Sequence, residues 1–211
     1  LGENTRLSEL DRNSFINYGM WRRQETNNEV TDTTIRNEYT TVNAIIKYAE
    51  RKGFIPFGRC ETEEIKITDP PRRDTFTLEE YKVFYTRMRD WVNDSVDPHE
   101  LYYRSLVRDF ILIKSNAFLR FGELIQLKWS MCKVVKHNGE KTIHLELPKE
   151  ICKNRKSRVV VSRGGSYMER IKKYCEYTTK NDFVFSHQNQ RKVVSKQVMY
   201  KYWKQLMEFS E

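Results

Sequence analysis

The spacing of apolar side chains predicts two helices in the first third of the chain. Residues 13–27 mix apolar and basic side chains, and apolar positions in the following segment recur at the intervals of one helix face. Thr31 or Asp32 can cap the start of this second helix, and Gly53 can end it. We therefore expect a helical unit over residues 1–68.

A proline pair separates this unit from the rest of the chain. Pro70 and Pro71 lack the backbone N–H that a helix needs and favour extended backbone before them. Arg72 and Arg73 follow directly. Residues 69–76 are therefore predicted to form an extended, basic linker.

Two more helices are predicted before any strand. Thr77 and Glu80 have the spacing of a capping box, in which each side chain binds the backbone amide of the other residue. A helix over residues 78–91 should follow this box. A longer helix with one apolar side is expected over residues 101–117.

The pattern then changes to the two-residue alternation of strands. Residues 134–135 and 142–147 flank Asn138 and Gly139, which tolerate the positive φ angles of a type I′ turn. A third strand is predicted over residues 158–162. Helical spacing returns over residues 167–177 and after Ser195, which can cap a last helix.

These elements predict a mainly α-helical chain with a small antiparallel sheet, which is an α+β fold. The helical unit covers residues 1–68, the linker 69–76 and a mixed unit 77–211. Hydrophobic residues make up 38% of the chain, with 11 Phe, 12 Tyr and 4 Trp. This content supplies two cores and excludes a disordered tail.

The net charge of +9 favours partners that carry phosphates or other anions. No stretch approaches the roughly 18 consecutive apolar residues of a membrane span, so we expect no membrane partner. The four cysteines form no C-x-x-C pair, which argues against a disulfide framework or a zinc site. We expect reduced cysteines, no metal and no cofactor.

The segment 116–129 carries the motif that narrows the function. It contains Leu-Arg-x-x-Glu-Leu-x-x-Leu-x-Trp, with Arg120 and Glu123 three residues apart. This order resembles the first signature box of the tyrosine recombinases, the phage integrase family. The family's Thr-Gly before the Leu-Arg pair is replaced here by Ala117 and Phe118.

A basic segment further along resembles a second motif of the same family. Lys153, Lys156 and Arg158 follow its K-x-x-K-x-R order, which the family carries on a hairpin. Pro-Arg-Arg followed by Thr-Leu-Glu-Glu resembles the start of the family's catalytic domain. The resemblance implies a helical core-binding domain over residues 1–68 and a partial catalytic domain over residues 77–211.

The resemblance also implies roles in a transesterification on DNA. Arg120, expected at the end of the long apolar helix, offers planar paired donors to the non-bridging oxygens of a phosphodiester. Lys153 would protonate the departing 5′ oxygen, because the pKa of a lysine falls among other cations or on desolvation. Glu123 would support the helix of Arg120 or its neighbours.

Basic residues on both predicted units make double-stranded DNA the expected partner. We expect the full-length protein to self-associate on DNA in the cytoplasm, as a bacterial or phage-encoded protein. The predicted DNA contacts are Arg22, Arg23, Lys47, Arg51, Arg72, Arg73, Lys156 and Arg158.

The family's H-x-x-R box and nucleophilic tyrosine are expected beyond Glu211. His187 and Arg191 stand one residue too far apart for the box, and Tyr200 and Tyr202 have the helical spacing of packing residues. We therefore expect an inactive part of an enzyme that cuts and rejoins DNA through a phosphotyrosine intermediate.

Two other classes of protein fit the same features. A non-catalytic DNA-binding regulator could keep the recombinase scaffold, whereas a continuation of the coding sequence into H-x-x-R and tyrosine would support the enzyme. A basic protein-interaction domain would show no salt-dependent DNA affinity. Taken singly, an arginine and a glutamate at this spacing most often form a surface ion pair. A single lysine in a basic segment is most often a solvated side chain.

Overall fold

The structure is a computed structural model that describes residues 4–67 and 74–210. The chain divides into two compact units, Leu1–Thr75 and Phe76–Glu211, and the division falls within the predicted linker. The two prolines and two arginines of that linker lie outside the described residues.

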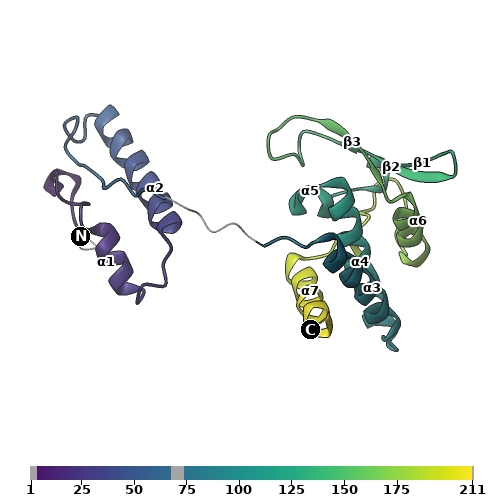
Figure 1. The fold of residues 1–211 in the computed structure, drawn as a ribbon. Helices are drawn as coiled ribbons and strands as arrows, with labels where there is room; N and C mark the ends of the chain where they lie inside the picture. The colour runs from purple at the N-terminus through teal and green to yellow at the C-terminus, as the bar shows by residue number, and fades with distance from the viewer. Residues whose placement is uncertain (1–3, 68–73, 211) are drawn as a thin grey trace. The chain divides into compact units, whose positions relative to one another are not determined.

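Unit 1 is helical, with a short 3-10 helix at Leu7–Glu9, α1 at Tyr18–Glu25 and α2 at Asp32–Arg51 (Figure 1). The hydroxyl of Thr31 accepts a hydrogen bond from a backbone N–H of the first turn of α2. Gly53 follows the helix with a φ of 71°, a conformation that favours glycine. Both predicted ends of α2 are therefore confirmed.

Helix α1 begins at Tyr18 rather than near Asn13. Phe15 forms an isolated β-bridge with Thr62, and the Tyr39 hydroxyl donates a 3.0 Å hydrogen bond to the Phe15 carbonyl. These contacts with distant parts of the unit hold the segment before α1 out of the helix. The prediction of the helix start was wrong because apolar spacing alone does not show them.

Unit 2 combines helices with two small antiparallel sheets. Its helices are α3 (Leu78–Asn93), α4 (Pro98–Ala117), α5 (Phe121–Ile125), a 3-10 helix (Trp129–Met131), α6 (Gly165–Tyr174) and α7 (Lys196–Ser210). Its strands are β1 (Cys132–His137), β2 (Glu140–Leu147), β3 (Arg158–Arg163), β4 (Ser186–His187) and β5 (Gln190–Val193). The predicted fold, mainly α with a small antiparallel sheet, is confirmed.

Local signals set the ends of α3 and α4. The Thr77 N–H donates to the Glu80 carboxylate at 2.7 Å, and the Glu80 N–H donates to the Thr77 hydroxyl at 3.2 Å, so the predicted capping box is present. Asp97 caps α4 with a 2.8 Å hydrogen bond, and Pro98 occupies its first turn. Helix α4 ends where Phe118 takes the left-handed conformation, with φ at 51°.

Strands β1, β2 and β3 form one antiparallel sheet in that order. Asn138 and Gly139 join β1 to β2 with φ angles of 48° and 83°, which confirms the predicted turn. Ile143, Leu145 and Leu147 of β2 are buried. The alternation in the sequence therefore reports the inner face of this sheet correctly.

The second sheet, β4 with β5, was not predicted. Its strands are two and four residues long, too short for alternation to be read. The buried Val184 and Phe185 just before it belong to the core of unit 2. Helix α6 covers Gly165–Tyr174, so it begins and ends earlier than the predicted range of 167–177.

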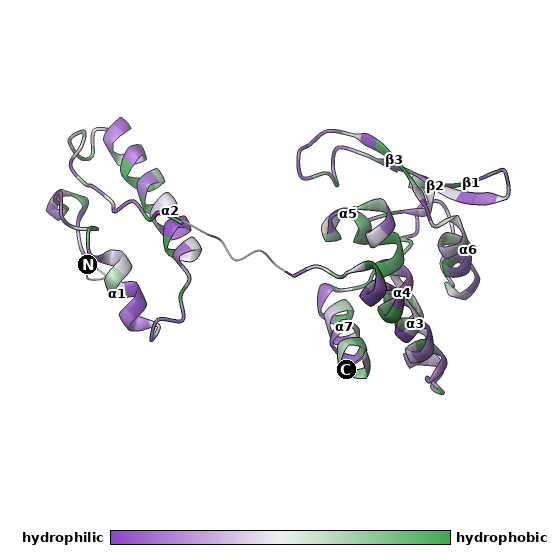
Figure 2. Ribbon diagram, viewed as in Figure 1, coloured by the Kyte–Doolittle hydropathy of each residue, from purple (hydrophilic) through white to green (hydrophobic). Residues whose placement is uncertain are grey.

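Helix α4 lies in the middle of unit 2, with contacts to α3, α6, α7 and β3 (Figure 1). Figure 2 shows hydrophobic residues concentrated on this helix and hydrophilic ones along the loop between β2 and β3. Leu106 and Ile113 of α4 are fully buried in the core. The core therefore fixes α4, and with it the residues that directly follow its end.

One carboxylate lies inside this core. Asp109 of α4 is fully buried and accepts hydrogen bonds from Nε of Arg170 at 3.0 Å, Nε of Arg108 at 3.1 Å and the hydroxyl of Tyr174 at 3.2 Å. Arg170 and Tyr174 belong to α6. The buried charge therefore joins α4 to α6.

Replacing Asp109 with asparagine should lower the free energy of unfolding by about 1.5–3 kcal/mol, the usual contribution of hydrogen bonds to a charged group. Urea denaturation followed by circular dichroism measures the loss. Asp94→Asn is the control, because Asp94 is exposed and lies 3.9 Å from Arg104; its change should stay within about 0.5 kcal/mol. Equal losses in both variants would contradict the role given to Asp109.

Candidate active site

Arg120 and Glu123 lie at the start of α5 rather than at the end of α4. After Phe118 turns the chain out of α4, Arg120 takes an extended conformation and becomes the N-cap of α5. The Glu123 carboxylate accepts the backbone N–H of Arg120 at 3.1 Å and its guanidinium Nη1 at 3.3 Å. The expected position of Arg120 is corrected accordingly, and Glu123 orients its side chain.

A second arginine reaches the same carboxylate from β3. Arg158 donates from Nη2 to Oε2 of Glu123 at 2.8 Å and from Nη1 to Oε1 at 3.3 Å. The Glu123 side chain is 2% exposed, whereas those of Arg120 and Arg158 are 54% and 38% exposed. One buried carboxylate thus holds two guanidinium groups that remain open to solvent. We call Glu123, Arg120 and Arg158 the Glu123 cluster.

Electrostatics keep this carboxylate ionised. Burial raises the pKa of Glu123, but the hydrogen bonds from Arg158 and Arg120 outweigh burial, and the pKa lies below its ordinary value of 4.5. The hydrogen bond to Glu123 in turn raises the pKa of Arg158. Two guanidinium groups and one carboxylate leave a net positive charge, which attracts a phosphate.

The low pKa of Glu123 predicts a pH-dependent contribution to stability. Because the folded pKa lies below the unfolded one, the contribution is complete above the unfolded pKa and is lost as the pH falls through the folded pKa. In Glu123→Gln, the free energy of unfolding should therefore fall less steeply than in the wild type between roughly pH 5 and pH 3. Urea titrations across this range test it.

The control for this experiment is Glu208→Gln, since Glu208 is an exposed glutamate of α7. This variant should keep the steepness of the wild type. A pH dependence that is identical in Glu123→Gln and in the wild type would show that the carboxylate titrates alike in the folded and unfolded chains.

Lys153 lies in the loop that joins β2 to β3. Its side chain is exposed, and no ion pair with it occurs among the described residues. The preceding residue, Cys152, is buried, and its Sγ lies 3.3 Å from Nη1 of Arg158. The loop is thereby attached to the Glu123 cluster at the residue before Lys153. Lys156 is exposed in the same loop.

The predicted DNA contacts of unit 1 lie on α1 and α2. Arg22 lies 3.2 Å from Glu38, and Arg23 lies 2.8 Å from Asp32, so both pair with acids of α2. Each arginine side chain is about one third exposed, and its guanidinium retains donors for a phosphate. Lys47 and Arg51 are exposed on α2.

The two tyrosines and the histidine set aside as catalytic candidates from the sequence differ in their surroundings. The Tyr202 side chain is buried, and its hydroxyl donates to Glu100 at 2.9 Å. Burial, followed by this hydrogen bond, raises the pKa of Tyr202. His187 Nδ1 lies 2.9 Å from the Tyr103 hydroxyl. Tyr200 is exposed and lines the groove described next.

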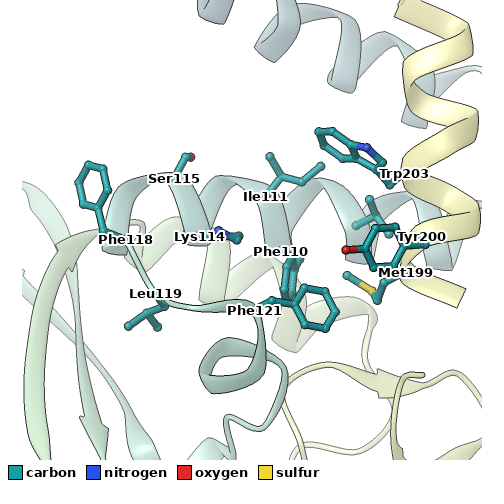
Figure 3. Close-up of a pocket in the computed structure, with 11 residues that line it drawn as sticks. Phe110, Ile111, Lys114, Ser115, Phe118, Leu119, Phe121, Met199, Tyr200 and Trp203 are labelled. Atoms are coloured by element: carbon teal, nitrogen blue, oxygen red, sulfur yellow. The ribbon is translucent and has the colours of Figure 1, made fainter. Parts of the chain in front are cut away.

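An apolar groove of about 570 Å³ lies between α4, α5 and α7 (Figure 3). Ser115, Lys114 and Tyr200 are its polar members, and no carboxylate lines it. The groove therefore offers an anion one charged donor, Lys114, whereas the Glu123 cluster offers two guanidinium groups. The remaining lining residues are Val107, Phe110, Ile111, Phe118, Leu119, Phe121, Met199 and Trp203.

Sequence reasoning missed the contact between Glu123 and Arg158 and the place of Cys152 beside it. Glu123 and Arg158 are 35 residues apart in the chain, so no local pattern joins them. The family motifs named both residues, but in separate boxes.

Over residues 4–67 and 74–210, no group of three or more His, Cys, Asp or Glu side chains could hold a metal ion. Every helix in these residues is too short or too polar to cross a membrane. The four cysteines are free thiols.

Comparison with known proteins places this architecture. A crystal structure of the XerH site-specific recombinase, bound to its difH substrate in a pre-cleavage complex, matches the whole chain with a TM-score of 0.66 and 18% identity. The chain spans 56% of the length of that recombinase. A comparison with curated proteins finds no match.

The family comparison covers the part of the chain that carries Arg120, Glu123, Lys153 and Arg158. Residues 75–211 match the model of the phage integrase family. This match includes all of unit 2, with its sheets and the Glu123 cluster. The fold and the family match agree with the motifs read from the sequence, and the chain belongs to the phage integrase family.

Proposed function

We propose that this chain is the DNA-binding part of a site-specific tyrosine recombinase that cuts and rejoins DNA through a phosphotyrosine intermediate. The observation that carries the proposal is the Arg120 guanidinium, held on one side by the buried Glu123 and open to solvent on the other. It lies beside a second arginine and the attachment point of the Lys153 loop. The similarity to the structure of XerH, a site-specific recombinase bound to its difH substrate, supports the same function.

Arg120 is proposed to bind the non-bridging oxygens of the scissile phosphate. A guanidinium stays charged at any working pH and presents donors in a plane that matches two phosphate oxygens. Glu123 fixes its orientation before DNA binds, so little reorganisation is needed when negative charge develops.

Lys153 is proposed as the general acid that protonates the departing 5′ oxygen. Its exposed side chain on the β2–β3 loop can reach into a groove of the duplex and bring an ammonium proton to the departing oxygen. We do not assign the nucleophile to Tyr200 or Tyr202, since Tyr202 is buried on Glu100 and Tyr200 faces the apolar groove.

Duplex DNA is proposed to contact basic residues of both units, with self-association of the full-length protein on its site. The exposed lysines of the β2–β3 loop are free to bind phosphates. The two arginines of α1 already use some of their donors in ion pairs with acidic residues of α2. The proposed contacts outside the Glu123 cluster are Arg22, Arg23, Lys47, Arg51, Arg72, Arg73, Lys153 and Lys156.

The double variant Lys153→Gln/Lys156→Gln tests this interface. Each lost phosphate contact should reduce the slope of log affinity against log salt by about 1, so the slope should fall by about 2. Fluorescence anisotropy with a labelled duplex at several salt concentrations measures it. Lys204→Gln is the control, because Lys204 is an exposed lysine of α7 outside the proposed interface. An unchanged slope in the double variant would remove the loop from the interface.

A further inference from the structure

The guanidinium of Arg158 joins three separate parts of unit 2. It donates to both carboxylate oxygens of Glu123, at 2.8 and 3.3 Å, and to the Sγ of Cys152, at 3.3 Å. Glu123 belongs to α5, whereas Cys152 lies in the loop that carries Lys153. Arg158 itself is the first residue of β3.

The sheet fixes the backbone position from which this side chain extends. Arg158 pairs with Leu147 of β2 at the end of the β2–β3 ladder, so these two residues close the loop that carries Lys153. Leu147 is buried, with 1% of its surface exposed. The backbone of Arg158 is therefore held by the sheet, opposite a buried residue, and not by the loop.

We propose that Arg158 is a positioning residue. It keeps Arg120, at the start of α5, and Lys153, in the β2–β3 loop, in fixed positions relative to each other. This inference rests on the proposed function, because it concerns how the two proposed catalytic groups are placed. Arg158 acts on Arg120 through Glu123 and on Lys153 through Cys152. It need not touch the scissile phosphate.

The geometry favours this role over a simple DNA contact. Both terminal nitrogens of Arg158 already serve Glu123, a carboxylate that burial makes costly to leave unpaired. A phosphate that drew Arg158 away would remove two of the four hydrogen bonds that Glu123 accepts from the two arginines. Arg120 would then lose the fixed orientation of its partner.

Three variants of the whole chain separate the two roles. Arg158→Met keeps the apolar stem and removes the donors, while Arg158→Lys keeps the charge and one donor group. Arg163→Met is the matched control, since Arg163 ends the same strand and is exposed. The readouts are the Glu123 carboxyl pKa by ¹³C NMR, amide hydrogen exchange, and the salt dependence of duplex binding.

In Arg158→Met, the pKa of Glu123 should rise, because the strongest hydrogen bond that lowers it is gone. Amides of α5 and of residues 148–157 should exchange roughly tenfold faster, as expected on losing a charge-assisted hydrogen bond. Arg158→Lys should restore part of both effects. Arg163→Met should leave both as in the wild type.

Two results would overturn the inference. One is a Glu123 pKa and an exchange pattern that Arg158→Met leaves unchanged. The other is a salt slope that falls by about 1 in Arg158→Met and recovers in Arg158→Lys, while the Glu123 pKa stays constant; this would make Arg158 a phosphate contact. Failure of the proposed function looks different: the wild type would then show no salt-dependent DNA affinity, or every form of the protein would bind DNA without cleaving it.

Discussion

Raising the salt concentration from 50 to 200 mM is expected to weaken the binding of this protein to duplex DNA by roughly 10³–10⁵-fold. That loss corresponds to the neutralisation of about 6–10 phosphates. At each phosphate, a lysine or arginine takes the place of a condensed counterion, which is released. The net charge of +9 and basic residues on both units are sufficient for this number of contacts. Fluorescence anisotropy with a labelled duplex gives the affinity at each salt concentration.

The control for this prediction is a duplex of unrelated sequence. Its affinity should also fall steeply with salt, since phosphate contacts carry no sequence information. Weak binding that does not respond to salt would instead favour a basic protein-interaction domain. The salt series therefore separates these two classes of protein before any target site is known.

Replacing Arg120 with alanine is expected to reduce strand cleavage by about 10²–10³-fold in a cleavage-competent form of the protein, the usual effect of losing one preorganised donor to a developing charge. DNA affinity should stay nearly unchanged, because Arg120 would supply one phosphate contact among several. Single-turnover cleavage of a suicide substrate, together with anisotropy on the same duplex, measures the two effects separately.

Lys153→Ala provides the contrast to this variant. It should also slow cleavage, but a substrate with sulfur in place of the bridging 5′ oxygen should recover much of the loss, because a thiolate leaves without a proton. Arg120→Ala should show no such recovery, since its role is on the non-bridging oxygens. Equal losses of binding and cleavage in both variants would reduce these residues to parts of the DNA-binding surface.

A third outcome would favour the regulator considered from the sequence. Salt-dependent DNA binding with no cleavage by any form of the protein would mean that the scaffold binds DNA without performing the reaction. The Glu123 cluster would then hold phosphates rather than assist their transfer.

Local chemistry in the sequence determined the elements with strong start or turn signals. The capping box of Thr77 and Glu80 and the turn at Asn138 and Gly139 are formed by neighbouring residues, so the prediction needed no knowledge of the fold. The inner face of β2 followed from alternation in the same way. The recombinase motifs likewise named Arg120, Glu123 and Lys153 as candidates, although they did not place them in space.

Tertiary structure alone decided how those candidates meet. Helix α4 ends at Ala117, as the apolar spacing predicts, but only the structure shows that Phe118 takes the left-handed conformation and that Arg120 becomes the N-cap of a separate short helix. Glu123 and Arg158 meet across 35 residues because the core places α5 beside the start of β3. Spacing along a chain reports contacts within one turn or one hairpin, whereas the burial of a charge between distant elements depends on how the whole core packs.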